Sequence, residues 1–183
     1  MNNTAEKIAL TAEDFLVWEI QQTEKYEFVA GEVFAMTGAR RVYVVFCLNI
    51  AASLKQQLRG TSCQTYIADM KLHVAAADAF FYPDVMVSCN AEDQQAEHYL
   101  AHPTVIIEVL SDSTEAYDRG AKFAAYRLLS NLQEYVLIDI DARRVELFSR
   151  TSANDWLLHV SDADCVLNSL GITIHSSELF EGI

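Results

Sequence analysis

A glutamate and a lysine lie near one another in the sequence, one at the end of a predicted strand and one in the helix that follows. The apolar run 105–107 is typical of a strand buried on both faces, and Glu108 comes directly after it. A charged side chain there costs several kcal/mol unless it is paired or coordinated. Residues 111–114 are of the types that cap helices, and behind them Asp118 and Lys122 share one helical face. A strand that delivers a carboxylate, followed by a helix that delivers a lysine, indicates an active site.

Two further acids lie in strand-like segments and could join Glu108. Asp84 precedes the apolar run 85–87, and Glu27 lies between Tyr26 and Phe28. If these strands are neighbours, their carboxylates can reach one point. Clustered carboxylates repel one another, so one of them must be protonated or a cation must neutralise them. Oxygen ligands without a convergent His or Cys favour Mg²⁺ or Mn²⁺ over Zn²⁺.

A lysine beside such a cation points to one class of reaction. Lys122 could orient an attacking water or stabilise the charge that develops on a phosphate. Metal-assisted hydrolysis of a phosphodiester is then the coherent chemistry. The structural alternative stays open for each residue, because an acid in an edge strand can face solvent and Lys122 can simply pair with Asp118 across one turn.

Length and composition bound the kind of protein. The 183 residues are 51% hydrophobic and 21% charged, which predicts one soluble globular domain spanning residues 1–183. The net charge of -13 excludes a global attraction to nucleic acid, since phosphate binding depends on Lys and Arg, so any such contact must be local. No segment has the ~20 apolar residues of a membrane span, and we expect a cytoplasmic protein with no membrane partner.

The cysteines form no CxxC pair, and three of them lie in apolar segments. This spacing predicts free thiols in a reducing cytosol. The four positions are Cys47, Cys63, Cys89 and Cys165.

Local patterns predict the elements that must position these side chains. Thr11 caps a helix that ends near Gln22, and residues 41–58 form a longer helix with Val45, Leu48, Ala52 and Leu58 facing inward. We expect one continuous strand at 80–88, with Pro83 near its start or on an edge. The other predicted strands are 25–29, 32–36, 63–67, 70–74, 105–109, 134–140, 145–149 and 156–160. This order predicts an α/β or α+β fold around a mixed β-sheet.

Several of these segments together resemble a known family. The segments are Tyr26-Glu27-Phe28-Val29-Ala30-Gly31-Glu32, Met36-Thr37-Gly38-Ala39, Pro83-Asp84-Val85, Ile107-Glu108-Val109-Leu110-Ser111, Ser113-Thr114, Asp118-Arg119 with Lys122, and Leu132 to Asp139. The chain resembles the Uma family, restriction endonucleases of PD-(D/E)XK type, from about Glu13 to the C-terminus. The resemblance implies a restriction endonuclease-like mixed β-sheet flanked by helices. It also implies a Mg²⁺-dependent (or Mn²⁺-dependent) endonuclease that acts on DNA.

The resemblance carries roles to individual residues. Asp84 matches the family's metal-binding aspartate, and Glu108 matches the acid of the (D/E)XK element. Leu110 stands where that element would have its lysine, and the resemblance implies that Lys122 of the following helix supplies the amine. Glu27 matches the acid of an N-terminal motif and is expected to face the same metal. All four are therefore predicted to be catalytic, with Asp84, Glu108 and Glu27 as metal ligands.

One departure from the family keeps a second hypothesis open. Tyr43-Val44 stands where the family commonly has a His-Asn pair, so a substrate or phosphate contact would be weakened or altered here. With the acidic charge, this departure motivates the alternative of a catalytically weak or inactive homodimeric binding or regulatory protein on the same scaffold. A hydrolase of another phosphate ester would use the same carboxylates. For an endonuclease, two cuts in a duplex need two active sites, so a homodimer is also expected there by analogy.

Overall fold

A mixed six-stranded sheet forms the centre of the molecule. The computed structural model describes residues 6–7, 10–36, 38–162 and 164–183. The central sheet has the order β12-β11-β10-β9-β7-β4, in which β9 and β10 are parallel and the other neighbours are antiparallel. Its strands are β4 (Gln64–Ile67), β7 (Val85–Ser88), β9 (Val105–Val109), β10 (Glu134–Asp139), β11 (Arg144–Arg150) and β12 (Trp156–Ser161). The predicted mixed sheet is confirmed.

A second six-stranded sheet has the order β1-β3-β2-β6-β5-β8. Its strands are β1 (Glu6–Lys7), β2 (Tyr26–Val29), β3 (Glu32–Ala35), β5 (Lys71–Val74), β6 (Ala79–Phe81) and β8 (Tyr99–Leu100). The predicted hairpin is β2–β3, and its turn residues Ala30 and Gly31 have φ angles of 47° and 88°. Positive φ at both central positions matches the twist of a two-residue hairpin, and glycine adopts it without a steric cost. Two short strands, β13 (Cys165–Leu167) and β14 (Ile172–Ile174), pair separately.

The helices begin close to the predicted positions. Thr11 caps α1 (Ala12–Glu19) in a capping box with Asp14, as the sequence predicts. The remaining helical segments are α2 (Arg41–Gln57), η1 (Ala75–Ala77), η2 (Asp93–Gln95), α3 (Glu115–Tyr117), the π-helical turn η3 (Asp118–Lys122), α4 (Phe123–Tyr126) and α5 (Ser176–Leu179). Among the helices of the described residues, none has the length and apolar character needed to cross a membrane.

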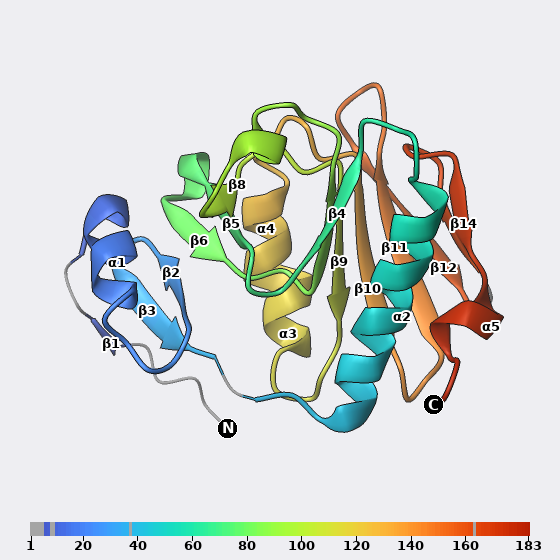
Figure 1. Ribbon diagram of the computed structural model, residues 1–183, viewed down its shortest axis with the longest axis horizontal. Coiled ribbons are helices and arrows are strands. Elements are labelled where there is room, and N and C mark those ends of the chain that lie inside the picture. The colour runs from blue at the N-terminus through green and yellow to red at the C-terminus, as the bar shows by residue number, and fades with distance from the viewer. Residues whose placement is uncertain (1–5, 8–9, 37, 163) are drawn as a thin grey trace.

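The layers place the segment α3–η3–α4 between the two sheets (Figure 1). One core cluster joins α2 to the central sheet through residues such as Phe46, Ile50 and Ile107. A second cluster joins α4 to both sheets, and includes Tyr126, Ile106 and Leu72. Because alternate residues of β9 point to opposite faces, Ile107 faces α2, whereas Ile106 and its alternation partner Glu108 face α4.

The predicted single strand at 80–88 is wrong, and the break has a physical cause. β6 belongs to the second sheet and β7 to the central sheet, with Tyr82, Pro83 and Asp84 between them. Proline has no N–H to donate to a ladder, so the strand ends before Pro83 and a new one begins after it. The chain crosses from one sheet to the other at this point.

The predicted inward face of the long helix is also wrong, except that Leu58 is buried as predicted. The buried side chains of α2 are Phe46, Ile50 and Leu54, whereas Leu48 is 61% exposed. The first half of α2 is apolar on nearly every side, so helical spacing alone does not choose between two faces. The aromatic volume of Phe46 is what fills the space against the central sheet and Phe180.

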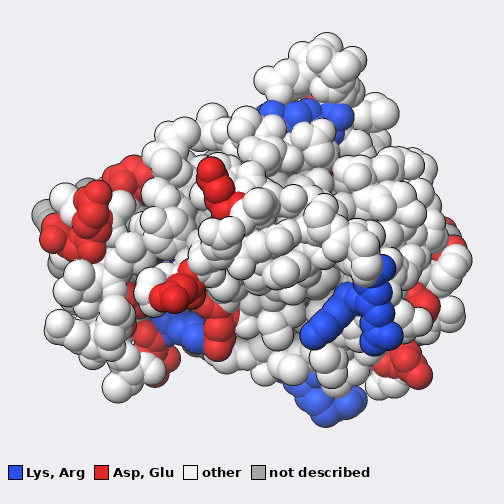
Figure 2. All heavy atoms as spheres, turned by 45° about the horizontal axis from the view of Figure 1, so that its top comes forward, with Lys and Arg blue, Asp and Glu red and all other residues white. Residues whose placement is uncertain are grey.

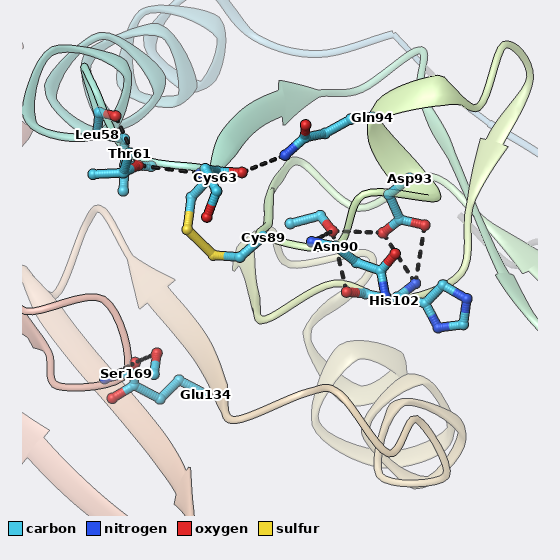
Figure 3. Close-up of a disulfide and its surroundings, with 12 residues drawn as sticks. Leu58, Thr61, Cys63, Cys89, Asn90, Asp93, Gln94, His102, Glu134 and Ser169 are labelled. Carbon is cyan, nitrogen blue, oxygen red and sulfur yellow. Dashed lines mark hydrogen bonds between the residues drawn. A yellow bond between two sulfur atoms is a disulfide. The ribbon is translucent and has the colours of Figure 1, made fainter.

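A disulfide corrects the prediction that all four cysteines are free. Cys63, directly before β4, is joined to Cys89, directly after β7, with the two Cα atoms 3.9 Å apart (Figure 3). The β4–β7 register pairs Gln64 with Ser88, so the next position along the antiparallel ladder places the two cysteines opposite one another. Cys47 and Cys165 are free, as predicted.

Candidate active site

Neighbouring strands bring Asp84 and Glu108 together, as the sequence analysis expected. β7 and β9 are antiparallel with Val85 opposite Ile107, so Asp84 lies beside Glu108. The Asp84 backbone N–H donates to Glu108 Oε2 at 3.3 Å. In return, the backbone N–H of Val109 donates to Asp84 Oδ2 at 2.7 Å. Each carboxylate is therefore held by the main chain of the other's strand.

The ammonium group of Lys122 pairs with three acids of the site. Its Nζ is 3.1 Å from Glu27 Oε1, 3.2 Å from Glu108 Oε1 and 3.4 Å from Asp118 Oδ1. Lys122 is 7% exposed, and the three acids are buried as well. A buried lysine with three carboxyl neighbours is paired rather than isolated, which is what allows its charge to be buried.

Glu27 reaches this group from the second sheet because of the crossing at Pro83. β2 pairs with β6, and the chain then leaves β6 at Tyr82, whose backbone N–H donates to Glu27 Oε1 at 3.2 Å. Two residues later the same segment supplies Asp84 to the central sheet. The break in the predicted strand is thus the feature that joins Glu27 to the other site residues.

The π-helical turn η3 sets the positions of Asp118 and Lys122. It begins at Asp118 and ends at Lys122, between the short helices α3 and α4. A π turn shifts the phase of a helix and is frequent at functional sites. Asp118 accompanies Lys122 into the buried group, so the pairing that the sequence analysis kept as a structural alternative is present together with the contacts to Glu108 and Glu27.

Sequence reasoning did not find the tyrosines that contact these acids. The Tyr126 hydroxyl donates to Glu108 Oε1 at 2.8 Å, and the Tyr43 hydroxyl donates to Asp84 Oδ1. The sequence could have indicated Tyr126, because it lies four residues after Lys122 and therefore on the same helical face. Tyr43 lies on α2, and only its place as a departure from the family pattern singled it out.

Burial and crowding change the proton affinity of the site. Desolvation raises the pKa of Glu108 well above its ordinary value; Lys122 opposes this rise, and the charges of Asp84 and Asp118 add to it. Desolvation likewise raises the pKa of Asp84, against the lowering effect of its hydrogen bonds from Tyr43 and Val109. For Lys122, desolvation alone would lower the pKa, but Glu108 and Glu27 raise it well above its ordinary value. Lys122 is therefore an ammonium group, a donor and a source of positive charge rather than a base.

The cluster holds more acid than base. Glu27, Glu108 and Asp118 share the ammonium group of Lys122, and Asp84 adds a fourth carboxyl group beside Glu108. Within the described ranges, no three His, Cys, Asp or Glu side chains are arranged as a ready-made metal site. Of the three predicted ligands, Asp84 and Glu108 are in mutual contact, and Glu27 is separated from them by Lys122.

The surface above the site is open mainly at Asp84. Glu108 is 2% exposed and Glu27 is 6% exposed, whereas Asp84 is partly exposed. A small cavity of about 30 Å³ lies close by, at the carboxyl ends of β9 and β10, and its lining includes Arg40, Ser111 and Asp112. On the face seen in Figure 2, basic side chains stand in separate small groups, and acidic side chains gather over the N-terminal elements at the left.

Comparisons with known proteins agree with this architecture. A crystal structure from Anabaena variabilis, described as a "putative nuclease belonging to DUF820", superposes with a TM-score of 0.75 over 94% of this chain and 98% of that one, at 16% identity. The fold of this chain, mixed sheets flanked by helices, is therefore nuclease-like. The family Uma2, described as "Putative restriction endonuclease", matches residues 12–182. The chain belongs to the Uma2 family.

Two relatives come from Synechocystis, and both are named as uncharacterized proteins. One, slr1290, is 31% identical over 176 residues, which cover 95% of this chain and 93% of the relative. The other, sll1609, is 35% identical over 151 residues, which cover 81% of this chain and 85% of the relative.

Proposed function

We propose that this chain is a Mg²⁺- or Mn²⁺-dependent endonuclease that hydrolyses phosphodiester bonds of DNA. The observation that carries the proposal is the convergence of four predicted residues from separate elements in one group, which is buried except at Asp84. Glu27 comes from β2, Asp84 from the segment before β7, Glu108 from β9 and Lys122 from η3. Membership of the Uma2 family, described as "Putative restriction endonuclease", supports the same reaction class.

The residues present fit a hard divalent cation. The groups that could coordinate the ion are all carboxylates, and the acids outnumber the single ammonium group. Asp84 and Glu108 would hold the cation, which when bound would polarise the phosphate and lower the pKa of a water molecule. Glu27 contacts Lys122, so its first role in the proposal is to hold the ammonium group in place, and metal coordination by Glu27 is its second.

Lys122 supplies a positive charge from the protein, in addition to that of the cation. Its ammonium group is fixed by Glu108 and Glu27 before any substrate arrives. A fixed charge in a buried site stabilises negative charge developing on a phosphoryl oxygen without reorganisation, which is the largest usual contribution to such catalysis. Lys122 thereby takes the role of the lysine that Leu110 replaces in the (D/E)XK element.

DNA would be held by local contacts, since the chain has a net charge of -13. Arg40 and Arg41 lie at the start of α2, within one turn of Tyr43, and could make such contacts. Arg40 also lines the small cavity beside Ser111. Cutting both strands of a duplex would need a second copy of the site, so the proposal includes a homodimer.

A plasmid assay tests the proposal. Supercoiled DNA is incubated with the purified protein and Mg²⁺ or Mn²⁺, and nicked and linear products are measured. We expect Asp84→Asn, Glu108→Gln and Lys122→Met each to lower the rate by at least ~100-fold. The matched control is Glu134→Gln, which changes a buried carboxylate outside the site and should leave the rate within about threefold when the protein is folded. Wild-type protein without nicking activity, or equal activity in Asp84→Asn, would contradict the proposal.

The contact between Tyr43 and Asp84 favours a second candidate function. A hydroxyl on the most open carboxylate, in a chain of net charge -13, suits a catalytically weak homodimeric binding or regulatory protein on the same scaffold. Such a protein would retain DNA in a gel-shift assay in the presence of Mg²⁺ and Mn²⁺ but leave it uncut. Size-exclusion chromatography with light scattering would show whether it is a dimer.

A further inference from the structure

Both carboxylate oxygens of Asp84 accept a hydrogen bond, one from a backbone N–H and one from a side-chain hydroxyl. Oδ2 accepts the backbone N–H of Val109 at 2.7 Å, and Oδ1 accepts the Tyr43 hydroxyl. The Val109 N–H belongs to the strand next to β10 and cannot turn away without breaking the sheet. The Tyr43 hydroxyl belongs to a side chain and can leave by rotation about its own bonds. Oδ1 is therefore the oxygen of Asp84 that can be released.

Tyr43 contacts Asp84, the one partly exposed carboxylate of this acid group. It lies in the first turn of α2, on the opposite side of the central sheet from Lys122 and Tyr126. Its side chain is only partly buried, and its neighbour Val44 is 55% exposed. Tyr126, which makes the corresponding contact with Glu108, is fully buried in the second core cluster. Of these two tyrosines, Tyr43 is the one with solvent available as an alternative position.

We infer that Tyr43 competes with a divalent cation for Asp84 and lowers the cation affinity of this chain. The inference rests on the proposed function, in which Asp84 and Glu108 hold the cation. A hydroxyl bonded to Oδ1 occupies an oxygen through which Asp84 would bind the ion, so cation binding must first break that bond. Hydrogen bonds to charged groups are strong enough to change a binding constant by about tenfold or more.

Titration calorimetry with MnCl₂ tests the inference at pH 7.5 on the full chain. We expect Tyr43→Phe, which keeps the ring and removes the hydroxyl, to bind Mn²⁺ about tenfold more tightly than the wild type. Tyr66→Phe is the matched control, because the Tyr66 hydroxyl bonds Gln64 on β4, away from the site, and should leave the affinity unchanged. A near-ultraviolet difference spectrum gives a second readout: Mn²⁺ should perturb a tyrosine band of the wild type that Tyr43→Phe lacks.

The outcomes separate this inference from the proposed function. Equal Mn²⁺ affinities for the wild type and Tyr43→Phe would overturn competition by Tyr43 and leave the metal site standing. Weaker binding by Tyr43→Phe would overturn it too, since Tyr43 would then hold Asp84 in place for the ion. No binding by either protein would overturn the metal site of the proposed function and the inference with it. Binding by Tyr43→Phe alone would support both. In every supporting case, adding Glu108→Gln to Tyr43→Phe should abolish the gain in Mn²⁺ affinity.

Discussion

Two groups of buried carboxylates in the molecule have different surroundings. Glu134, at the start of β10, accepts the backbone N–H groups of Asn168 and Ser169 and the Ser169 hydroxyl. Asp93 is held in the same way, by the Ser88 hydroxyl and the N–H groups of Ala101 and His102 (Figure 3). These acids connect loops to strands, and neutral donors satisfy them.

The acids around Lys122 are instead crowded around one shared positive charge. Three carboxyl groups, those of Glu27, Glu108 and Asp118, share one ammonium group, and desolvation raises the pKa values of Asp84 and Glu108. Such crowding of like charges costs folding free energy, whereas Glu134 and Asp93 accept from neutral N–H and hydroxyl groups without competing for a shared cation. Burial alone therefore does not distinguish the two groups of acids, whereas the crowding of several carboxyl groups around one ammonium group does.

The largest expected effect comes from removing the single positive charge. Lys122→Met should lower the free energy of unfolding by about 3–5 kcal/mol near pH 8, because Glu27, Glu108 and Asp118 lose their shared partner. The loss should shrink as the pH falls toward 4, where carboxyl groups with raised pKa values are already protonated. Urea denaturation at several pH values measures both effects, and a loss independent of pH would contradict the electrostatic account.

A smaller loss is expected in the structural region. Glu134→Gln replaces an oxygen acceptor by an amide N–H₂ that faces the donors of Asn168 and Ser169. We expect the free energy of unfolding to fall by about 2 kcal/mol, with little dependence on added Mn²⁺. Thermal melts with and without Mn²⁺ check this, and a melting temperature more sensitive to Mn²⁺ than that of the wild type would remove the distinction between the two regions.

The smallest effect should have the opposite sign. Asp84→Asn can accept from Val109 and donate to the Tyr43 oxygen, and it removes one crowded charge, so the apo protein should gain about 1 kcal/mol near pH 8. Because the pKa of Asp84 is raised in the fold, wild-type stability falls as the pH rises from about 4 through the folded value. The gain should therefore vanish below about pH 4, and a variant less stable than the wild type at pH 8 would contradict it.

The predictable part of the fold depended on local signals. The cap at Thr11, the turn at Ala30-Gly31 and the apolar run of β9 each lie within a few residues, and each was predicted correctly. The split around Pro83 was missed because its two halves belong to different sheets, and a single-strand pattern carries no information about which sheet a strand joins. The face of α2 was missed because its apolar residues surround most of the helix.

The candidate site, too, was predictable where the signals were local and not where a contact depends on how distant elements pack. Glu108 and Lys122 could be linked along the chain, and Asp84 could be linked to them by assuming that two strong strands are neighbours, which the β7–β9 pairing confirms. Tyr43 could not be placed on Asp84, because that contact depends on how α2 packs over the sheet. The Cys63–Cys89 bond depends in the same way on the register of β4 against β7.

That disulfide also bears on how the protein should be handled. β4 is the outermost strand of the central sheet and has only the four-residue ladder with β7 to hold it in hydrogen-bond register. A preparation stored with a thiol reductant would lose the covalent link, and fraying of β4 would uncover the edge of β7, whose residues are all buried. Uncovered apolar edges pair with other chains. Reduced stocks should therefore become turbid sooner than oxidised stocks at the same concentration, and a Cys63→Ser, Cys89→Ser variant should behave like the reduced protein in either buffer.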